Sequence, residues 1–191
     1  MNKIIGILGM QGAIAEHQEI LLQIPHTKTR IVKTAKDLDC IDGLILPGGE
    51  STAIGKLLDY FSLKEILQQK IISGLPVFGT CAGLILLAKN IENQTNTHLA
   101  TMDITVKRNG YGSQLDSFST NLLIPTIDKN MSIPLVFIRA PYITKTGKDV
   151  QILATLDNKI IAARQKNMLV TAFHPELTND LRFHQYFLSM I

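Results

Sequence analysis

A cysteine between two glycines is the part of this sequence best suited to covalent chemistry. Cys81 lies in the segment Gly79-Thr80-Cys81-Ala82-Gly83, directly after the apolar run 75–78. A buried strand that turns abruptly into a helix holds a nucleophile in a tight turn, and only small neighbours let the backbone come close. The positive end of a helix over residues 82–88 favours the thiolate over the thiol. The pattern therefore predicts a nucleophile elbow.

The segment Phe173-His174-Pro175-Glu176 supplies the groups that such a nucleophile needs. A thiolate requires a base for its proton, a group that orients the base, and donors for the oxyanion formed on attack. His174 is the candidate base and Glu176 the candidate orienting carboxylate, because side chains two residues apart on an extended segment share a face. The backbone N–H groups of Gly49 and Ala82 are the candidate oxyanion donors. Together these residues predict acyl transfer.

Each of these residues has a plainer explanation when it is taken alone. A cysteine after a buried strand is most often a small core residue. His174 could be a structural histidine and Glu176 a solvated carboxylate. Arg108 and Arg139 could be ordinary surface or ion-pair arginines. Only the combination of Cys81 with the histidine and the glutamate favours catalysis.

Glycine-rich turns follow two further predicted strands and should lie beside the elbow. They are Gly9-Met10-Gln11-Gly12 and Pro47-Gly48-Gly49-Glu50-Ser51. In an open parallel sheet, ligands bind at the carboxyl ends of the strands, so all three turns are expected to line one crevice. The second turn is expected to present an anion-binding nest, with Ser51-Thr52 capping the following helix. Neither turn has the spacing of a Walker loop or a dinucleotide site, which argues against nucleotide binding.

The order of apolar runs and amphipathic stretches predicts an α/β fold. β-α-β order in the first half indicates a parallel sheet with helices on both faces. The later strands are expected to form an antiparallel addition to this sheet. The result is a three-layer sandwich with a mostly parallel central sheet plus antiparallel additions, in one domain over residues 1–191. The predicted strands are 4–8, 29–32, 43–46, 76–79, 103–108, 116–124, 135–138, 150–156, 159–163 and 168–172, and the predicted helices are 13–22, 51–58, 63–72, 82–88 and about 180–190.

Composition excludes several classes of protein. The 191 residues are 46% hydrophobic and carry a net charge of +3, without a basic block that would suggest nucleic acid. The absence of a long apolar run argues against a membrane span. Two cysteines, Cys40 and Cys81, fit a reducing cytoplasm better than a disulfide scaffold. Cysteine and histidine spacing predicts no metal site, and the histidines at 17, 26, 98 and 184 are expected to be surface or helix-face residues.

The motifs together resemble a known family. G-T-C-A-G at 79–83 with H-P-E at 174–176 resembles the class I triad glutamine amidotransferases, which have a flavodoxin-like fold. Longer segments narrow the resemblance to the PdxT/SNO family, the glutaminase subunit of pyridoxal 5′-phosphate synthase. It spans nearly the whole chain, and its P-G-G-E-S-T and I-R-A-P segments are more specific than the triad motifs. Those longer segments are 9–12, 44–52, 78–88, 108–109, 114–118, 137–141 and 173–178.

The resemblance implies an activity and a substrate. Cys81 would attack the side-chain amide of L-glutamine, with His174 and Glu176 completing the triad, to give glutamate and ammonia. Bound glutamine would contact residues that match the family's binding positions, and no cofactor is implied. Those positions are Gly49, Glu50, Ser51, Arg108, Ile138 and Arg139.

The resemblance also implies a partner. Ammonia would pass to a TIM-barrel synthase subunit in a large hetero-oligomer, with the segment around Gln11 at the interface. The chain departs from the family pattern at Ser113, where arginine is usual, and at Tyr142, where histidine is common. Neither position belongs to the triad. The alternative is a Cys-elbow protein of similar fold acting as a peptidase, deglycase-like enzyme or chaperone. Such proteins typically take their histidine from directly after the elbow, where this chain has Ala82 and Gly83.

Overall fold

The computed structural model describes residues 2–110 and 117–191. Two sheets lie within this part of the chain. The strands of the large sheet are β1 (Lys3–Leu8), β2 (Thr27–Val32), β3 (Gly43–Leu46), β4 (Val77–Thr80), β5 (Ala88–Ile91), β6 (Met102–Lys107), β9 (Tyr142–Thr146), β10 (Gln151–Leu156), β11 (Lys159–Gln165) and β12 (Met168–Thr171). They follow the order β2-β1-β3-β4-β12-β11-β9-β6-β5, with β10 paired to β11. A separate antiparallel pair is formed by β7 (Ser117–Leu122) and β8 (Ile133–Ile138).

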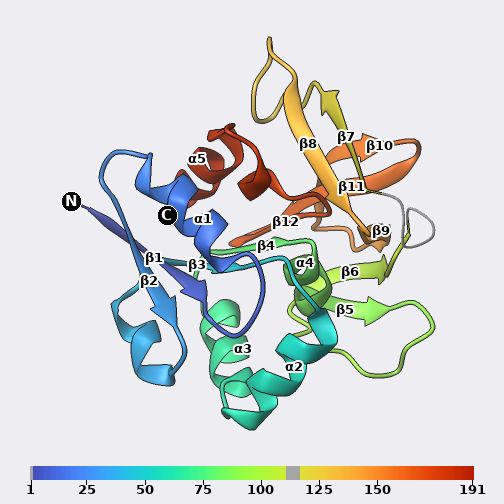
Figure 1. The fold of residues 1–191 in the computed structure, drawn as a ribbon. Coiled ribbons are helices and arrows are strands. Elements are labelled where there is room, and N and C mark those ends of the chain that lie inside the picture. Colours follow the sequence, from blue (N-terminus) through green and yellow to red (C-terminus); the bar gives the residue numbers. More distant parts are fainter. Residues whose placement is uncertain (1, 111–116) are drawn as a thin grey trace.

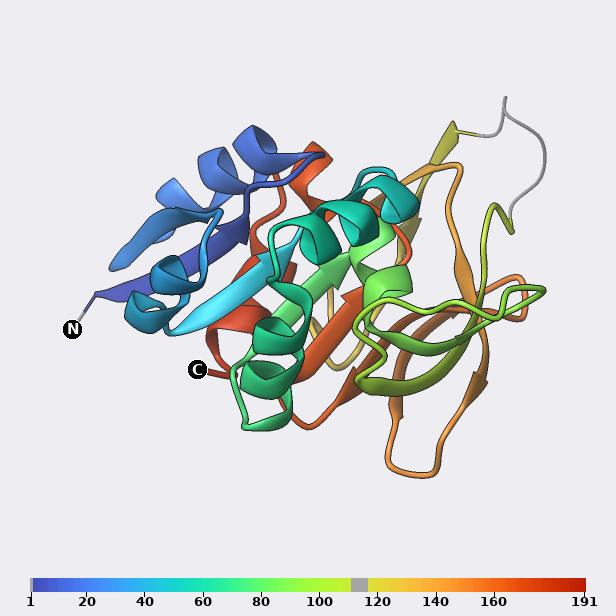
Figure 2. The same ribbon diagram turned by 90° about the horizontal axis from the view of Figure 1, so that it is seen from below.

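Helices cover both faces of the large sheet, as predicted. They are α1 (Ile14–Leu22), α2 (Ser51–Tyr60), α3 (Lys64–Ile72), α4 (Ala82–Leu87) and α5 (Arg182–Leu188), with the short 3₁₀ turns η1 (Ala35–Cys40) and η2 (Pro175–Leu177). In Figure 1, α1 and α5 lie on one face and α2 and α3 on the other. Figure 2, which is seen from below, shows α2 and α3 in front of the strands of the sheet. No helix in the described ranges is long and apolar enough to cross a membrane.

The central strands are apolar because both of their faces are covered. All residues of β3, β4 and β12 are buried. A parallel sheet between two helical layers has no solvent face, so its strands read as continuous apolar runs rather than alternating ones. This explains why the short runs 43–46 and 76–79 predicted their strands to within one residue.

The second half of the sheet differs in part from the prediction. The expected antiparallel addition is present, because β11 pairs antiparallel with β12 and β9, and β9 pairs antiparallel with β6. Two pairings were not predicted: β12 also pairs in parallel with β4, and β5 pairs in parallel with β6. β12 pairs antiparallel with β11 and is therefore the junction between the two parts of the sheet. Strand pairing depends on where the connections lead, which apolar runs alone do not reveal. The predicted start of a strand at Asp116 lies outside the described residues.

The turn after β4 has the strained backbone of an elbow. Cys81 has φ 48° and ψ −96°, a conformation that side chains rarely adopt. Its backbone N–H donates to the carbonyl of Thr171 in β12, at 2.8 Å. Gly83 lets α4 approach β3 so closely that a Cβ atom there would lie 2.1 Å from the carbonyl oxygen of Leu46. The elbow is therefore fixed by both neighbouring strands.

Replacing Gly83 by alanine should destabilise the fold strongly. The new methyl group meets backbone rather than a flexible side chain, so we expect the free energy of unfolding to fall by about 3 kcal/mol. Gly74→Ala is the matched control. Gly74 has φ +107° but open space around its Cβ position, so only backbone strain of about 1 kcal/mol is expected there. Urea unfolding of both variants measures the difference, and equal losses would contradict the close approach of α4 to β3.

Candidate active site

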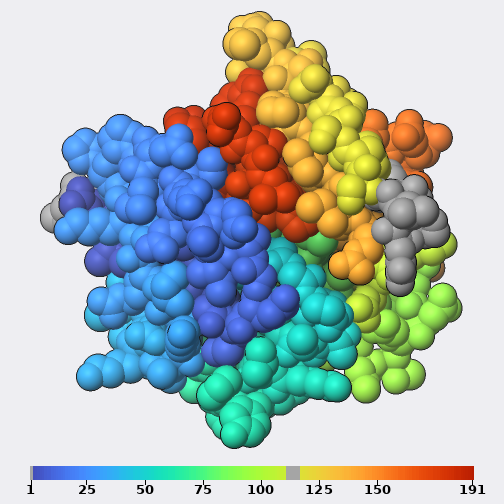
Figure 3. Space-filling model, viewed as in Figure 1, coloured from blue at the N-terminus to red at the C-terminus, as the bar shows by residue number. Residues whose placement is uncertain are grey.

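A pocket of about 330 Å³ opens where the turns after β3 and β4 meet. Its volume is near the lower end of small-molecule sites, roughly 300–1,000 Å³, and suits a ligand the size of an amino acid. Figure 3 shows early segments in blue and teal meeting later ones in orange and red on this face. The pocket is lined by Gln11, Gly49, Glu50, Ser51, Cys81, Ile85, Arg108, Asn109, Ile138, Arg139, Pro141 and His174.

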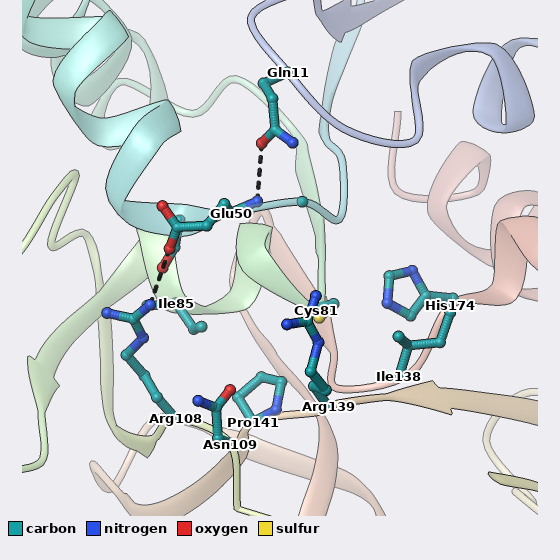
Figure 4. Close-up of a pocket in the computed structure, with 12 residues that line it drawn as sticks. Gln11, Glu50, Cys81, Ile85, Arg108, Asn109, Ile138, Arg139, Pro141 and His174 are labelled. Atoms are coloured by element: carbon teal, nitrogen blue, oxygen red, sulfur yellow. Dashed lines mark hydrogen bonds and ion pairs between the residues drawn. The ribbon is translucent and has the colours of Figure 1, made fainter. Parts of the chain in front are cut away.

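The structure brings the three candidate triad residues together. The Nδ1 atom of His174 lies 2.7 Å from Oε1 of Glu176, and the Cys81 side chain is close enough to His174 to raise its pKa. Cys81 and His174 both line the pocket (Figure 4). Glu176 is not among the lining residues and is only 4% exposed. The arrangement is a continuous line from thiol to imidazole to carboxylate.

Close packing fixes the His174 ring. Its backbone N–H donates to the carbonyl of Val136, at 2.8 Å. The ring also lies directly against Gly48, where a Cβ atom would come within 2.4 Å of the ring carbon Cε1. Glycine at this position therefore allows the loop after β3 to touch the candidate base.

The electrostatics of the site favour a charged histidine. Burial alone lowers the pKa of His174, but the hydrogen bonds with Cys81 and Glu176 and the charge of Glu176 outweigh it and raise the pKa to about 10. Burial alone raises the pKa of Glu176, whereas the interactions with His17 and His174 lower it, and the net shift is downward. His174 and Glu176 therefore form a buried ion pair at neutral pH.

The loop after β3 caps α2 differently from the prediction. The expectation that Ser51-Thr52 would cap the helix was wrong, because Glu50 is the N-cap and its carboxylate accepts from the N–H groups of Thr52 and Ala53. Glutamate is long enough to reach these groups itself, which leaves the hydroxyl of Ser51 unused. Ser51 is 2% exposed, and its Oγ has no hydrogen-bond partner within the described ranges. A buried hydroxyl at the pocket wall is available to a ligand.

The two arginines that line the pocket differ in their hydrogen-bond and ion-pair partners. Arg108 donates to Oε1 of Glu50 at 3.0 Å and to Oγ1 of Thr52 at 3.2 Å. Arg139 has an unusual backbone φ of 44° and an exposed side chain, which Figure 4 shows extending to the side of the pocket where Cys81 lies. No ion pair of Arg139 is found among residues 2–110 and 117–191. Arg139 is therefore the more available of the two to a ligand carboxylate.

Gln11 connects the first turn to this loop. Its side chain is exposed, and its Oε1 accepts from the backbone N–H of Glu50 at 2.8 Å (Figure 4). Ala13, two residues later, donates its N–H to the carbonyl of Gly48 at 2.9 Å. The turn that precedes α1 thus holds the loop after β3 at two points.

Some functional positions were placed differently, or missed, by the sequence analysis. Ala82 does not line the pocket, although its N–H is at the first position of α4, where no acceptor exists within the helix. Tyr142 is not among the lining residues, and Ser113 lies outside the described residues. Ile85, Asn109 and Pro141 do line the pocket but were not singled out. They fall inside motifs quoted for the resemblance, which is the signal that pointed to them.

The largest error concerns buried polar residues. His17 and His184 lie on helices as expected, but both are completely buried rather than at the surface. The spacing of His17 with Ile20 and Leu21 on one helix face is the signal that could have shown this. Cys40 is exposed. No cluster of possible metal ligands is found in the described part of the chain.

Comparison with known proteins identifies relatives over almost the entire chain. A model of the SNO glutamine amidotransferase family matches residues 7–191. A protein from Ruminiclostridium cellulolyticum, named pyridoxal 5′-phosphate synthase subunit PdxT, is 53% identical over 189 residues, covering 99% of this chain and 100% of that protein. A protein of the same name from Haemophilus influenzae strain PittGG is 55% identical over 189 residues, with 97% of both chains covered.

Solved structures agree with the sequence comparisons. A crystal structure described as a glutamine amidotransferase superimposes with a TM-score of 0.89 at 38% identity, covering 97% of both chains. The structure of PurLQS from Thermotoga maritima shares the fold, with a TM-score of 0.73 at 14% identity over 99% of both chains. The chain therefore belongs to the SNO glutamine amidotransferase family.

Proposed function

We propose that this chain, acting as one glutaminase domain over residues 1–191, hydrolyses L-glutamine to L-glutamate and ammonia and supplies the ammonia to a pyridoxal 5′-phosphate synthase. The observation that carries the proposal is the line Cys81–His174–Glu176 at the wall of a pocket the size of an amino acid. Relatives more than 50% identical are named as subunits of that synthase.

The reaction has two steps through one thioester. The Cys81 thiolate attacks the carbonyl carbon of the glutamine amide, and the tetrahedral intermediate collapses as protonated His174 gives its proton to the leaving nitrogen, which departs as ammonia. Neutral His174 then takes a proton from water, whose oxygen attacks the thioester carbon. Glutamate leaves, and the thiolate and the imidazolium are restored. Glu176 stabilises the charged form of His174 in both steps.

The oxyanion of each tetrahedral intermediate needs donors beside the thiol. The N–H of Ala82 follows Cys81 directly at the start of α4, and Gly49 lines the pocket with Cys81. Preorganised backbone donors of this kind are usually the largest electrostatic contribution to acyl transfer. We assign this role to the N–H groups of Ala82 and Gly49.

The free amino acid end of glutamine is assigned to pocket-lining groups outside the triad. Arg139 is assigned to the carboxylate, because Arg108 is already paired with Glu50. The unpartnered hydroxyl of Ser51 is assigned to a polar group of the same ligand. Glu50 and Ile138 complete this set of groups, together with the backbone of Gly49.

The synthase partner is assigned to the side of the molecule that carries Gln11. Gln11 is exposed, yet it is one hydrogen bond from the pocket loop at Glu50. A protein that contacts Gln11 at the pocket rim can therefore alter the loop through this hydrogen bond. In this proposal the partner is the TIM-barrel subunit of a large cytoplasmic hetero-oligomer.

Cys81→Ala should abolish glutamine hydrolysis while the fold is kept, because alanine removes the nucleophile and adds no bulk to the elbow. Cys40→Ala is the matched control, since Cys40 is the exposed cysteine and lies outside the pocket. Glutamate release is measured for both variants, alone and with a synthase subunit. We expect the subunit to stimulate the wild type and Cys40→Ala only. Turnover by Cys81→Ala would remove the nucleophile assignment.

The ion pair of His174 and Glu176 should appear in pH titrations. The pKa of His174 is raised from 6.5 to about 10. The contribution of this histidine to folding stability is therefore fully present below pH 6.5 and is lost as the pH rises through 10. NMR titration of the histidine rings should show this midpoint in the wild type and a lower one in Glu176→Gln. Between pH 7 and 10, the free energy of unfolding should fall more in the wild type than in Glu176→Gln. A wild-type midpoint near 6.5 would contradict the ion pair.

Arg139→Ala should weaken glutamine binding more than it slows the chemistry. Loss of a charged hydrogen bond to the ligand carboxylate costs about 1.5–3 kcal/mol, which corresponds to a KM raised roughly 10- to 100-fold with kcat little changed. Arg30→Ala, at an exposed arginine on β2, is the control and should leave both constants unchanged. Steady-state kinetics with glutamine measures them. An unchanged KM in Arg139→Ala would exclude the assigned contact with the carboxylate.

A further inference from the structure

A line of buried polar side chains continues behind the candidate triad. Oε1 of Glu176 faces His174, whereas Oε2 is buried without a hydrogen-bond partner in the described ranges. Nε2 of His17 lies 3.5 Å from this second oxygen. Nδ1 of His17 lies 2.9 Å from Nε2 of His184. The line therefore joins η2, which carries the glutamate, to α1 and α5.

His17 also faces a threonine of the elbow. Its Nε2 is 3.1 Å from Oγ1 of Thr80, and this hydroxyl oxygen accepts from the N–H of Gly48, at 3.0 Å. Nε2 of His17 is therefore directed toward two oxygens, one from Thr80 and one from Glu176. Both oxygens belong to segments that form the pocket wall or the triad.

Both buried histidines are neutral. Burial lowers the pKa of His17 and outweighs the charges of Glu176 and Glu16, which raise it, while His174 lowers it further. Burial and the neighbouring His17 hold the pKa of His184 well below its usual value. Each ring therefore carries one N–H, and one of two tautomer arrangements must hold.

Hydrogen-bond chemistry selects between the two arrangements. If His17 carried its proton on Nδ1 and donated to His184, its Nε2 could accept from the hydroxyl of Thr80, but this lone pair would also face the Glu176 carboxylate, and the proton on Nδ1 of His184 would be buried without an acceptor. If instead both rings carry the proton on Nε2, His184 donates to His17, and His17 donates toward Glu176 and Thr80. Of the nitrogens of the two rings, only Nδ1 of His184 then lacks a partner, and it carries a lone pair rather than a proton. The second arrangement therefore avoids both a lone pair of His17 that faces a carboxylate and a buried N–H of His184 that has no acceptor.

We propose that His17 is a positioning residue of the triad, whose Nε2–H holds the second oxygen of Glu176, and that His184 fixes this tautomer by donating to Nδ1 of His17. Its catalytic consequence rests on the proposed function. His174 is bonded to one oxygen, and the N–H of His17, which is shared with Thr80, faces the other at 3.5 Å, so the carboxylate is held in the orientation that keeps Oε1 on His174. A neutral donor does this without the extra positive charge that would weaken the hold of Glu176 on the imidazolium.

The tautomers test the proposal without any assay of activity. Long-range ¹⁵N–¹H NMR correlations of histidine-labelled wild-type protein distinguish a proton on Nε2 from one on Nδ1. We expect His17 and His184 both to carry the proton on Nε2 at neutral pH. A proton on Nδ1 of His17, or a charged His17, overturns the proposal.

Two substitutions of His17 separate positioning from packing. Gln places an amide nitrogen near the position of Nε2 and can still donate to Glu176, whereas Asn reaches only the position of Nδ1. We expect His17→Gln to keep most of the activity. His17→Asn should lower kcat about 10- to 100-fold, as other changes behind a catalytic residue do, with the KM for glutamine unchanged. His26→Asn, at an exposed histidine, is the control.

The titration midpoint of His174 distinguishes the possible results. It should fall by about one pH unit in His17→Asn, because the carboxylate that holds its proton is less well oriented, and stay in place in His17→Gln. A purely structural role would lower the melting temperature of both variants without moving this midpoint, and would refute the proposal. Thr80→Val should leave the midpoint unchanged; a fall equal to that in His17→Asn would show that His17 serves Thr80 instead.

Failure of the proposed function can be told apart from failure of this inference. If the wild type does not release glutamate from glutamine, the function is wrong, while the tautomers and the midpoints still decide the role of His17. If the wild type is active and the two His17 variants are equal in kcat and midpoint, the inference alone is wrong.

Discussion

The close approach of backbone at the turn after β4 is the constraint on which the site depends. β3, β4 and β12 end side by side, and Cys81 leaves β4 at φ 48° with its N–H still bound to Thr171. Gly83 brings α4 against the carbonyl of Leu46 at the end of β3. Because the surrounding core over-determines this turn, the strained conformation persists. The same strand ends carry the Gly48 loop to the ring of His174, so one packing arrangement sets both the thiol and the base.

Burial of Glu176 imposes the second constraint. An isolated carboxylate in the interior costs several kcal/mol, and the cost is offset only when its partners are well placed. His174 supplies the compensating charge at 2.7 Å. A second full charge at position 17 would share the carboxylate and weaken its hold on His174. Burial keeps His17 neutral at physiological pH, so it is the N–H of His17, rather than a charge, that faces Glu176.

The sequence predicted the parts of this arrangement that follow local rules. Short apolar runs ending in glycine turns located β3, β4 and the elbow, and the common edge of a parallel sheet placed Glu50 near Cys81. The direction of β12 and the burial of His17 and His184 were not predicted, because they depend on which segments meet in space. The N-cap at Glu50 was missed for a related reason. Its side chain competes with Ser51 for the same N–H groups, and propensity alone favours serine.

Helix α1 links the two constraints. The turn before it holds the loop after β3 through Gln11 and through the N–H of Ala13 on the carbonyl of Gly48. One turn into the helix, His17 reaches the elbow at Thr80 and the carboxylate of Glu176. A shift of α1 would therefore alter the loop after β3 and the candidate triad together. Gln11 is exposed at the start of this segment, so a protein bound there would act on both through a single rigid element.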